Sequence, residues 1–505
     1  MNRSVISNFL ILLLSVSCSS IVIEREDDGS HFDNRSLAVR SRSASETEDL
    51  YFVSQRMAEL FISSQKSNPR IVGIEPYEME GVVCLYVINF ENGYKIVSAD
   101  TRTQPVLAAC EEGVLHPGET DNPGVKVWLE DTADRIRFLK KYNPEVKEDY
   151  SDLWSPFRSY DSGPIPTRAV NDSLFFDEDL IWIRVVESSV LTSYCNANQS
   201  ALMTTKWGQG SPWNAAAPLD YVTGMRCVTG CAAVAVSQVL RYFNKKGSSP
   251  TDLWHTAYVS STTPHFYPIF VDGNTYYQVF VTTTLTKSWY TSNSSRWGKM
   301  PDTQTGSHTE YVARLMLDIG NRVDMQYSQV LSVVVPDTLN YTYSIPNLPQ
   351  CGISSSYAPF HFPSAAMDIQ SKKPVIISAY CDPAPSGGHV WVMDGCHDLC
   401  QIHTTTETFY CISPEDYYSY SNIVDVYTVG EMMSINPNVY HGMQTTVSST
   451  HTYKDLHMNW GSDGDGDGYY NMLNSDDWIL PSGDTTLNFL YERRMHYNIS
   501  TSQIN

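Results

Sequence analysis

A cysteine in the middle of the chain stands where a nucleophile would be expected. Cys231 follows Gly230 and opens a run of alanines and apolar residues that recur at helical spacing. This pattern predicts a buried helix with Cys231 in its first turn, where unpaired backbone N–H groups and the helix dipole favour the nucleophilic thiolate. The alternative is a small buried apolar residue, because free cysteines are among the most buried residue types.

A histidine and an asparagine later in the chain have the side chains that a thiol nucleophile needs. His389 follows Gly387 and Gly388 at the start of an expected strand, and a neutral imidazole can take the thiol proton and return it to a leaving amine. The two glycines would let a substrate backbone approach closely. Asn459 can accept a hydrogen bond from the imidazole, and the indole of Trp460 can shield that bond from water. Cysteine, histidine and asparagine occur in the order of a papain-like site, although each residue alone has an ordinary structural explanation.

A glutamine upstream of the cysteine is a candidate oxyanion donor. Gln209 lies in the run Trp-Gly-Gln-Gly-Ser-Pro-Trp-Asn over 207–214. Its side-chain amide is a neutral donor of the kind that stabilises tetrahedral intermediates. Taken alone, a loop glutamine would be expected to face solvent.

Together these motifs resemble the streptopain family of papain-like cysteine peptidases. The segments that carry the resemblance are 206–214, 229–239, 315–327, 387–395 and 459–469, while residues 93–100 and 105–107 resemble the family's inhibitory prodomain. The resemblance implies that Cys231 is the nucleophile and His389 the general base and acid. It also implies that Gln209 is the oxyanion donor, and that Asn459 orients the imidazole with Trp460 beside it.

The same resemblance implies a zymogen that cleaves protein or peptide substrates, is inhibited by its own prodomain and needs no cofactor. Family members prefer an apolar residue at the second substrate position before the cut. Ser462 occupies the place of the family's second tryptophan, so the substrate preference is open here. Cys227, four residues before the nucleophile, is either an inert thiol or part of a regulatory disulfide, which would need close and correctly aimed side chains.

Two groups of elements would position these residues. Helical spacing over 46–63 and 125–142, two β-rich runs around Asn92-Gly93 and a short strand at 105–109 predict a small α+β domain. A second region combines helices from Cys231 and over 309–320 with strands at 375–378, 389–395 and on both sides of His451. The expected fold class is α+β: an α+β prodomain followed by a papain-like domain with a helical lobe and an antiparallel β lobe.

The expected domain boundaries follow from these patterns. They are a signal peptide (1–18), a polar tether (19–45), the inhibitory prodomain (46–145), a cleavable linker (146–195) and the peptidase domain (196–505). The linker contains several prolines and a glycine, which predicts exposure to proteolysis. Its candidate cleavage sites are Lys147, Arg158 and Arg168.

The first residues have the features of an export signal. Arg3 precedes an apolar run over 9–14 that is too short to span a bilayer as a helix. Small residues precede Cys18 as in a bacterial lipoprotein, although Ser15 stands where leucine is usual. We therefore expect an exported protein that is either secreted after cleavage by an ordinary signal peptidase, or anchored to the outer membrane or cell surface through a lipid on Cys18.

Charge and metal-ligand patterns exclude some classes of function. The net charge of −22 argues against nucleic-acid binding, which requires a basic face. The run from Asp463 to Asp467 begins like a calcium loop, but its twelfth position is Asn474 rather than a carboxylate. Cysteines and histidines between 396 and 411 have loose spacing for zinc, so no metal site is expected.

Two other functions are compatible with the same residues. A transglutaminase-like acyltransferase uses the same three side chains with an amine in place of water, but the resemblance to an inhibitory prodomain disfavours it. A catalytically inactive surface binding protein would be expected if Cys231 or His389 were replaced, and neither is. A cysteine endopeptidase is therefore the leading hypothesis.

Overall fold

The computed structural model describes most of the chain after residue 49. The described residues are 50–65, 70–158, 172–176, 181–246, 257–271, 274–287, 294–334, 344–381, 388–412, 440–473, 478–479 and 491–501. The predicted signal peptide and tether, Arg168, Gly387 and Asn474 lie outside them. Within these ranges no helix is both long and apolar enough to cross a membrane.

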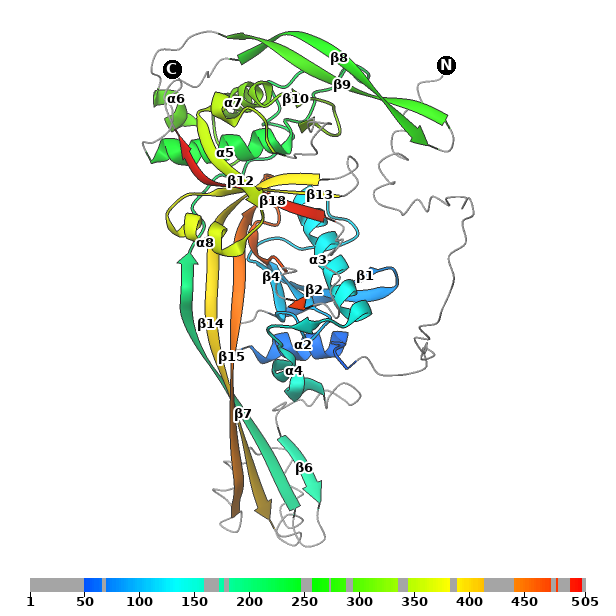
Figure 1. Cartoon of the computed structure of the whole chain (residues 1–505), viewed down its shortest axis with the longest axis vertical. Coiled ribbons are helices and arrows are strands. Elements are labelled where there is room, and N and C mark those ends of the chain that lie inside the picture. Colours follow the sequence, from blue (N-terminus) through cyan, green and yellow to red (C-terminus); the bar gives the residue numbers. More distant parts are fainter. Residues whose placement is uncertain are drawn as a thin grey trace, which may run out of the picture.

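One large antiparallel sheet runs through the molecule and confirms the mixed helix and strand content expected (Figure 1). Its strands follow the order β1-β2-β3-β4-β16-β15-β14-β13-β18-β12, and β7 pairs with β14 and β6. The bounds are β1 (Ile71–Met79), β2 (Val82–Phe90), β3 (Tyr94–Ser98), β4 (Val106–Cys110), β6 (Asp172–Phe176), β7 (Ile181–Gln199), β12 (Ile353–Pro359), β13 (Val375–Cys381), β14 (Gly388–Ile412), β15 (Tyr440–Asn459), β16 (Gly468–Asn471) and β18 (Tyr491–Thr501).

The N-terminal unit contains the helix, hairpin, strand and helix that its sequence predicts. Helix α2 (Gln55–Ser64) begins after Ser54, whose hydroxyl accepts a hydrogen bond from the Met57 N–H at 3.1 Å. Because this cap has extended backbone, the predicted start of the helix at residue 46 is wrong for residues 50–54. Helix α3 (Pro123–Tyr142) follows the expected range closely, and strand β1 is an element that the sequence patterns did not reveal.

The pairing of β4 with β16 makes the N-terminal unit part of the same sheet as the rest of the chain. Ala108 and Ala109 of β4 lie opposite Tyr470 and Tyr469 of β16. The strands that carry His389 and Asn459 follow next in the sheet. Residues far apart in sequence are thereby fixed in one plane.

Helix α5 (Cys231–Lys245) begins at Cys231, as predicted. Gly230 has a φ of 88°, and a Cβ there would lie 2.6 Å from the Met325 sulfur, so the position requires glycine. The helix packs in one core with α7 (Thr309–Arg322), Trp207 and Trp213. This end of the molecule also contains α6 (Ser294–Lys299), β8 (Ala257–Val271), β9 (Asn274–Lys287), β10 (Met325–Gln326) and β11 (Val333–Val334).

Residues 146–195, expected to be a cleavable linker, contain regular structure in the parts that are described. Helix α4 (Ser151–Arg158) and strands β6 and β7 lie in this range, and β7 pairs with β14 along its whole length. The β-rich run from Ile181 to Val186 explains this correction, because it favours a strand over an exposed linker. The remaining short elements are β5 (Glu145–Val146), β17 (Trp478–Ile479), α8 (Phe362–Gln370) and the 3₁₀ turn Leu348–Cys351.

Candidate active site

The N-terminus of α5 meets the first residues of β14. Burial raises the pKa of the Cys231 thiol, and hydrogen bonds from the backbone N–H groups of Val390, Ala232 and Cys231 itself only partly offset that effect. Val390 is the neighbour of His389 in β14. The structure therefore brings the predicted nucleophile and the predicted base to one place from segments about 160 residues apart.

His389 is almost fully buried and electrically neutral at pH 7. Its Nε2 lies 2.8 Å from the carbonyl oxygen of Trp460, and the Trp391 ring stacks nearly parallel to the imidazole. Burial lowers the pKa of His389 to about 4, although the bond to Trp460 opposes this shift. Since a carbonyl oxygen only accepts, Nε2 carries the proton and Nδ1 carries the lone pair of the neutral ring.

The side chain of Asn459 holds two other segments together. Its Nδ2 donates to the Thr205 carbonyl at 2.7 Å, and its Oδ1 accepts from Gln238 Nε2 at 2.9 Å. The hydrogen bond that the sequence assigned to Asn459 is made by the Trp460 backbone carbonyl in this structure. A role of Asn459 in orienting the imidazole stays a prediction.

Gln238 is a member of the site that sequence reasoning missed. It lies in α5, is fully buried, and accepts a hydrogen bond from the Thr205 hydroxyl at 2.8 Å while donating to Asn459. A polar residue on the buried side of an otherwise apolar helix is the signal that could have revealed it. Gln238 therefore links the nucleophile helix, the Gln209 loop and strand β15.

The loop that carries Gln209 is held beside Cys231 by backbone and side-chain contacts. The Gln209 carbonyl accepts from the Thr229 N–H at 3.0 Å, two residues before the nucleophile. Asp463, which the sequence suggested only as part of a calcium-like loop, accepts from the Trp213 indole at 2.5 Å. Its backbone N–H also donates to the Trp207 carbonyl at 3.3 Å. Asp463 thus ties this loop to the segment that follows Trp460.

Trp460 is positioned by the same segment. Its backbone N–H donates to the Asp467 carboxylate at 2.9 Å, and its indole donates to the Gly466 carbonyl at 2.9 Å. Burial raises the pKa of Asp467 to about 7. Among the described residues no group of three His, Cys, Asp or Glu side chains is placed to bind a metal ion.

The beginning of helix α3 packs directly on this site. A Cβ on Gly124 would lie 2.8 Å from His389 Cδ2 and would also collide with the Trp460 indole. Asn122, two residues before Gly124, donates from Nδ2 to the Asp465 carbonyl at 2.6 Å. The N-terminal unit therefore covers the imidazole.

Comparison with known families identifies both parts of the chain. A model of the peptidase C10 family matches residues 207–470, more than half of the chain, and a model described as Spi protease inhibitor matches residues 38–136. The chain belongs to the peptidase C10 family. It is a cysteine peptidase zymogen whose N-terminal part is an inhibitory prodomain.

Two solved structures are similar to this C10 peptidase. A mutant fragment of Prevotella intermedia prointerpain A is 19% identical, with a TM-score of 0.44, and the match covers 86% of this chain and all of that one. The active wild-type Prevotella intermedia interpain A cysteine protease is 20% identical, with a TM-score of 0.32, and covers 60% of this chain and 95% of its own. No curated protein matches the chain.

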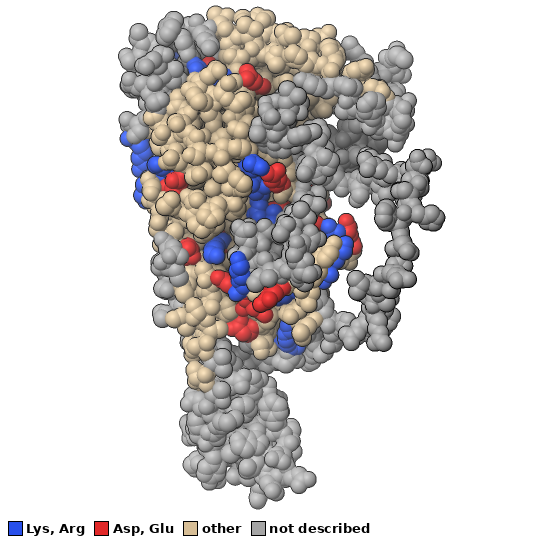
Figure 2. Space-filling view, viewed as in Figure 1, with Lys and Arg blue, Asp and Glu red and all other residues tan. Residues whose placement is uncertain are grey.

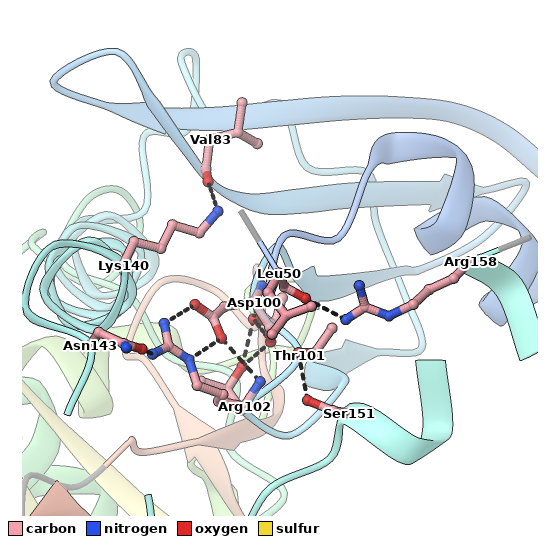
Figure 3. A network of polar contacts seen from close by, with 11 residues as sticks. Leu50, Val83, Asp100, Thr101, Arg102, Lys140, Asn143, Ser151 and Arg158 are labelled. Carbon is pink, nitrogen blue, oxygen red and sulfur yellow. Dashed lines mark hydrogen bonds and ion pairs between the residues drawn. The ribbon is translucent and has the colours of Figure 1, made fainter. Parts of the chain in front are cut away.

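The candidate cleavage sites of the zymogen differ in their surroundings. Arg158 ends helix α4 and donates to the Leu50 carbonyl at 2.6 Å, while Ser151 at the start of α4 shares a 2.8 Å hydrogen bond with Thr101 (Figure 3). Helix α4 is thus docked on the prodomain. Cleavage at Arg158 would require the end of α4 to detach from Leu50. Lys147, by contrast, is exposed and lies outside any helix. Gly388, the described one of the two candidate substrate-binding glycines, is exposed at the start of β14.

Figure 3 also shows the polar centre of the prodomain. The Arg102 guanidinium pairs with both oxygens of Asp100 and donates to Asn143 at the end of α3. Lys140 donates to the Val83 carbonyl at 3.0 Å. These contacts fix the C-terminal end of α3 to the strands of the prodomain, at the opposite end of the helix from Gly124.

Proposed function

We propose that the protein is an exported thiol endopeptidase in which Cys231 attacks the peptide bond and the prodomain blocks the site until the linker is cut. The observation that carries this proposal is the meeting of the Cys231 thiol with the Val390 N–H beside a neutral, buried His389. A thiol and a neutral imidazole with a free lone pair are the reactants needed to generate a thiolate. Family membership supplies the reaction class.

The reaction would proceed through an acyl-enzyme. His389 Nδ1 takes the thiol proton, the Cys231 sulfur forms a bond to the substrate carbonyl carbon, and the oxygen becomes an oxyanion. The Gln209 amide and the backbone N–H of Cys231 stabilise that charge. The C–N bond then breaks as the imidazolium returns its proton to the leaving amine, and water, deprotonated by His389, cleaves the thioester and restores the thiol.

The prodomain would restrain catalysis in two ways. It places the start of α3 on the imidazole, which excludes a substrate from that side. In the uncut chain, burial also raises the pKa of the Cys231 thiol and lowers the pKa of His389, which disfavours the thiolate and the imidazolium that catalysis requires. After cleavage near Lys147, Arg158 or Arg168 the prodomain is lost by dilution, because the linker no longer holds it at a high effective concentration.

We further propose a two-lobed papain-like peptidase domain and an exported location. Helices α5 and α7 pack in one core, and α5 supplies Cys231. The strand-rich part supplies His389 and Asn459, which is the division expected of two lobes. Export rests on the signal-like residues 1–18, and either free secretion or a lipid on Cys18 would follow from it.

Proteolysis in trans tests the proposal. Full-length Cys231→Ala protein should remain intact alone and be trimmed between residues 147 and 195 when processed wild-type enzyme is added. Processed wild-type enzyme should digest an unfolded protein, and iodoacetamide should abolish that activity by alkylating the thiol. Digestion that persists after complete alkylation would rule out a thiol mechanism.

A further inference from the structure

An exposed apolar surface lies next to the residues that lead into Cys231. Its members are Leu219, Tyr221, Val222, Met225, Phe266 and Leu331, which we call the apolar face. Tyr221 and Met225 are 61% and 57% exposed. Scattered exposed apolar residues are ordinary, but a contiguous group of them on a folded surface marks an interaction site.

Hydrogen bonds hold the loops that carry the apolar face in place. The Asp220 side chain is buried and accepts from the Val222 and Thr223 N–H groups at 2.9 and 2.8 Å, which closes the loop that displays Tyr221. Its second oxygen accepts from the Gln329 N–H at 3.1 Å. Gln329 in turn contacts the Met225 sulfur at 3.1 Å. The one carboxylate of the loop is therefore used internally. Arg226 is exposed beside Met225, and its guanidinium donates to the Ala217 carbonyl.

The hairpin of β8 and β9 contributes the third segment. Phe266 of β8 meets Tyr221 edge-on, with 6.0 Å between ring centroids. The hairpin is attached beside it by paired backbone hydrogen bonds between Val281 and Tyr327, both at 2.8 Å. Of the residues in its two strands only Lys287 has a formal charge at neutral pH. Figure 2 shows that the upper part of the molecule, where this hairpin lies, carries few charged residues on the visible face.

The apolar face lies close to Cys231 along the chain. The Val228 N–H donates to the Ser328 carbonyl at 3.1 Å, and the Ser332 hydroxyl donates to the Val228 carbonyl at 2.7 Å, which joins the two displaying loops. Val228 lies three residues before Cys231, a distance of at most about 11 Å along the chain, and Met225 lies within about 22 Å. An extended substrate advances about 3.3 Å per residue, so a segment roughly three to six residues from the cut can reach this surface.

We infer that the apolar face is an accessory substrate-binding surface that takes an extended, uncharged and apolar segment of a protein substrate. The inference rests on the proposed function, and it adds a binding site outside the catalytic residues. The short chain distance to Cys231 favours a substrate over other occupants. A second copy of the chain is disfavoured because each copy carries a net charge of −22, which opposes self-association.

Paired decapeptides measure the contribution of this surface. Two peptides share the residues next to the cut, but one has leucine and the other serine at the positions three to six residues away on both sides. Processed wild-type enzyme should cleave the leucine peptide with a kcat/KM roughly tenfold higher, as expected for partial burial of a few apolar side chains. Equal values for the two peptides would overturn the inference.

Matched variants show whether the apolar face causes that preference. The Tyr221→Ser/Met225→Ser enzyme should lower the leucine-to-serine ratio to about one, since it removes apolar contact area from exposed positions. Met367→Ser is the control, because Met367 is 63% exposed on α8 and outside the apolar face, and it should retain the wild-type ratio. If the double variant kept the wild-type leucine-to-serine ratio, the preference for leucine would come from other residues and the inference would be wrong.

Two measurements separate the other outcomes. If light scattering shows that the wild type is a dimer and the double variant a monomer, with equal peptide ratios, the apolar face binds a second copy and the inference is wrong. If processed wild type cleaves no peptide, the proposed function fails. The apolar face is exposed in the uncut chain, so the inference can then be tested by binding alone. The affinities of uncut protein for fluorescently labelled leucine and serine peptides are compared. A higher affinity for the leucine peptide supports the inference, and equal affinities contradict it.

Discussion

Gly124 of the prodomain lies against His389 of the peptidase, so closely that a side-chain Cβ would come within 2.8 Å of the imidazole Cδ2. The residue is the second of helix α3, and Asn122 caps that helix through the N–H groups of Gly124 and Val125. The helix therefore begins on the catalytic histidine proposed here. Only a residue without a side chain allows this approach.

A larger residue at this contact should activate the uncut chain. Gly124→Leu would force α3 away from His389 and Trp460, at a cost of about 1–3 kcal/mol for overpacking. We expect the uncut variant to hydrolyse a short peptide about tenfold faster than uncut wild type. Gly118→Leu is the matched control, because no atom lies within 4 Å of a Cβ there. An uncut Gly124→Leu protein as inert as wild type would show that this contact does not control access.

Protonation of His389 should destabilise the uncut zymogen at acidic pH. Burial lowers the pKa of His389 to about 4, whereas an unfolded histidine titrates near 6.5. Between these values the unfolded chain binds a proton that the folded chain does not, so stability falls as the pH drops from about 6.5 to about 4. The loss attributable to this group is at most about 3 kcal/mol.

The comparison with His389→Gln isolates this effect. Burial raises the pKa values of Asp455 and Asp467 to about 7, so these carboxyl groups change stability in the opposite direction over the same range. The free energy of unfolding of wild type minus that of His389→Gln should therefore decrease as the pH is lowered through this window. A difference that is independent of pH would mean that the imidazole is not held neutral.

Removing Asn459 should lower stability as well as turnover. Asn459→Ala leaves the Thr205 carbonyl and the Gln238 Nε2 without their partners, and unsatisfied buried polar groups cost about 1–3 kcal/mol each. Gln238→Ala should lower the free energy of unfolding similarly, and the double variant should cost less than the sum. We expect kcat to fall less in Asn459→Ala than in His389→Ala. Unchanged stability in Asn459→Ala would restrict this residue to orienting the imidazole.

Gln209 should affect the chemical step more than substrate binding. Gln209→Ala should lower kcat by about a hundred- to a thousandfold with little change in KM, because an oxyanion donor acts on charge that develops in the transition state. Gln209→Glu, which keeps the shape but replaces the donor amide, should be similarly impaired. A loss confined to KM would assign Gln209 a structural role.

The sequence predicted the local elements of the site better than its long-range contacts. Gly230 and the alanine run placed a helix start at Cys231, and the Asn92-Gly93 turn predicted the prodomain hairpin. In contrast, the acceptor for His389 is the backbone carbonyl of Trp460. Every residue has such a carbonyl, so residue types do not predict which one accepts. The approach of Gly124 to His389 depends on the pairing of β4 with β16, which no local pattern encodes.

Strand β7 and the β8–β9 hairpin were missed for different reasons. The prolines and glycine before Ile181 favoured a linker interpretation, although the β-branched residues from Ile181 onward favour a strand. For the hairpin, the sequence carries a turn signal, because Asp272-Gly273 lies between two β-rich runs. That turn signal predicts the hairpin, but not where it lies. Its place near α5 depends on the backbone hydrogen bonds between Val281 and Tyr327.

The role of Cys231 as nucleophile is tested most directly by the rate at which linker-cut protein hydrolyses an internally quenched peptide. The rate is measured for wild type and for Cys231→Ala, the latter cut by added enzyme that is then removed. The cut wild type should hydrolyse the peptide and cut Cys231→Ala should not. The variant should keep its fold, because alanine fits the start of α5. Hydrolysis by cut Cys231→Ala at the wild-type rate would contradict the assignment of Cys231 as the nucleophile.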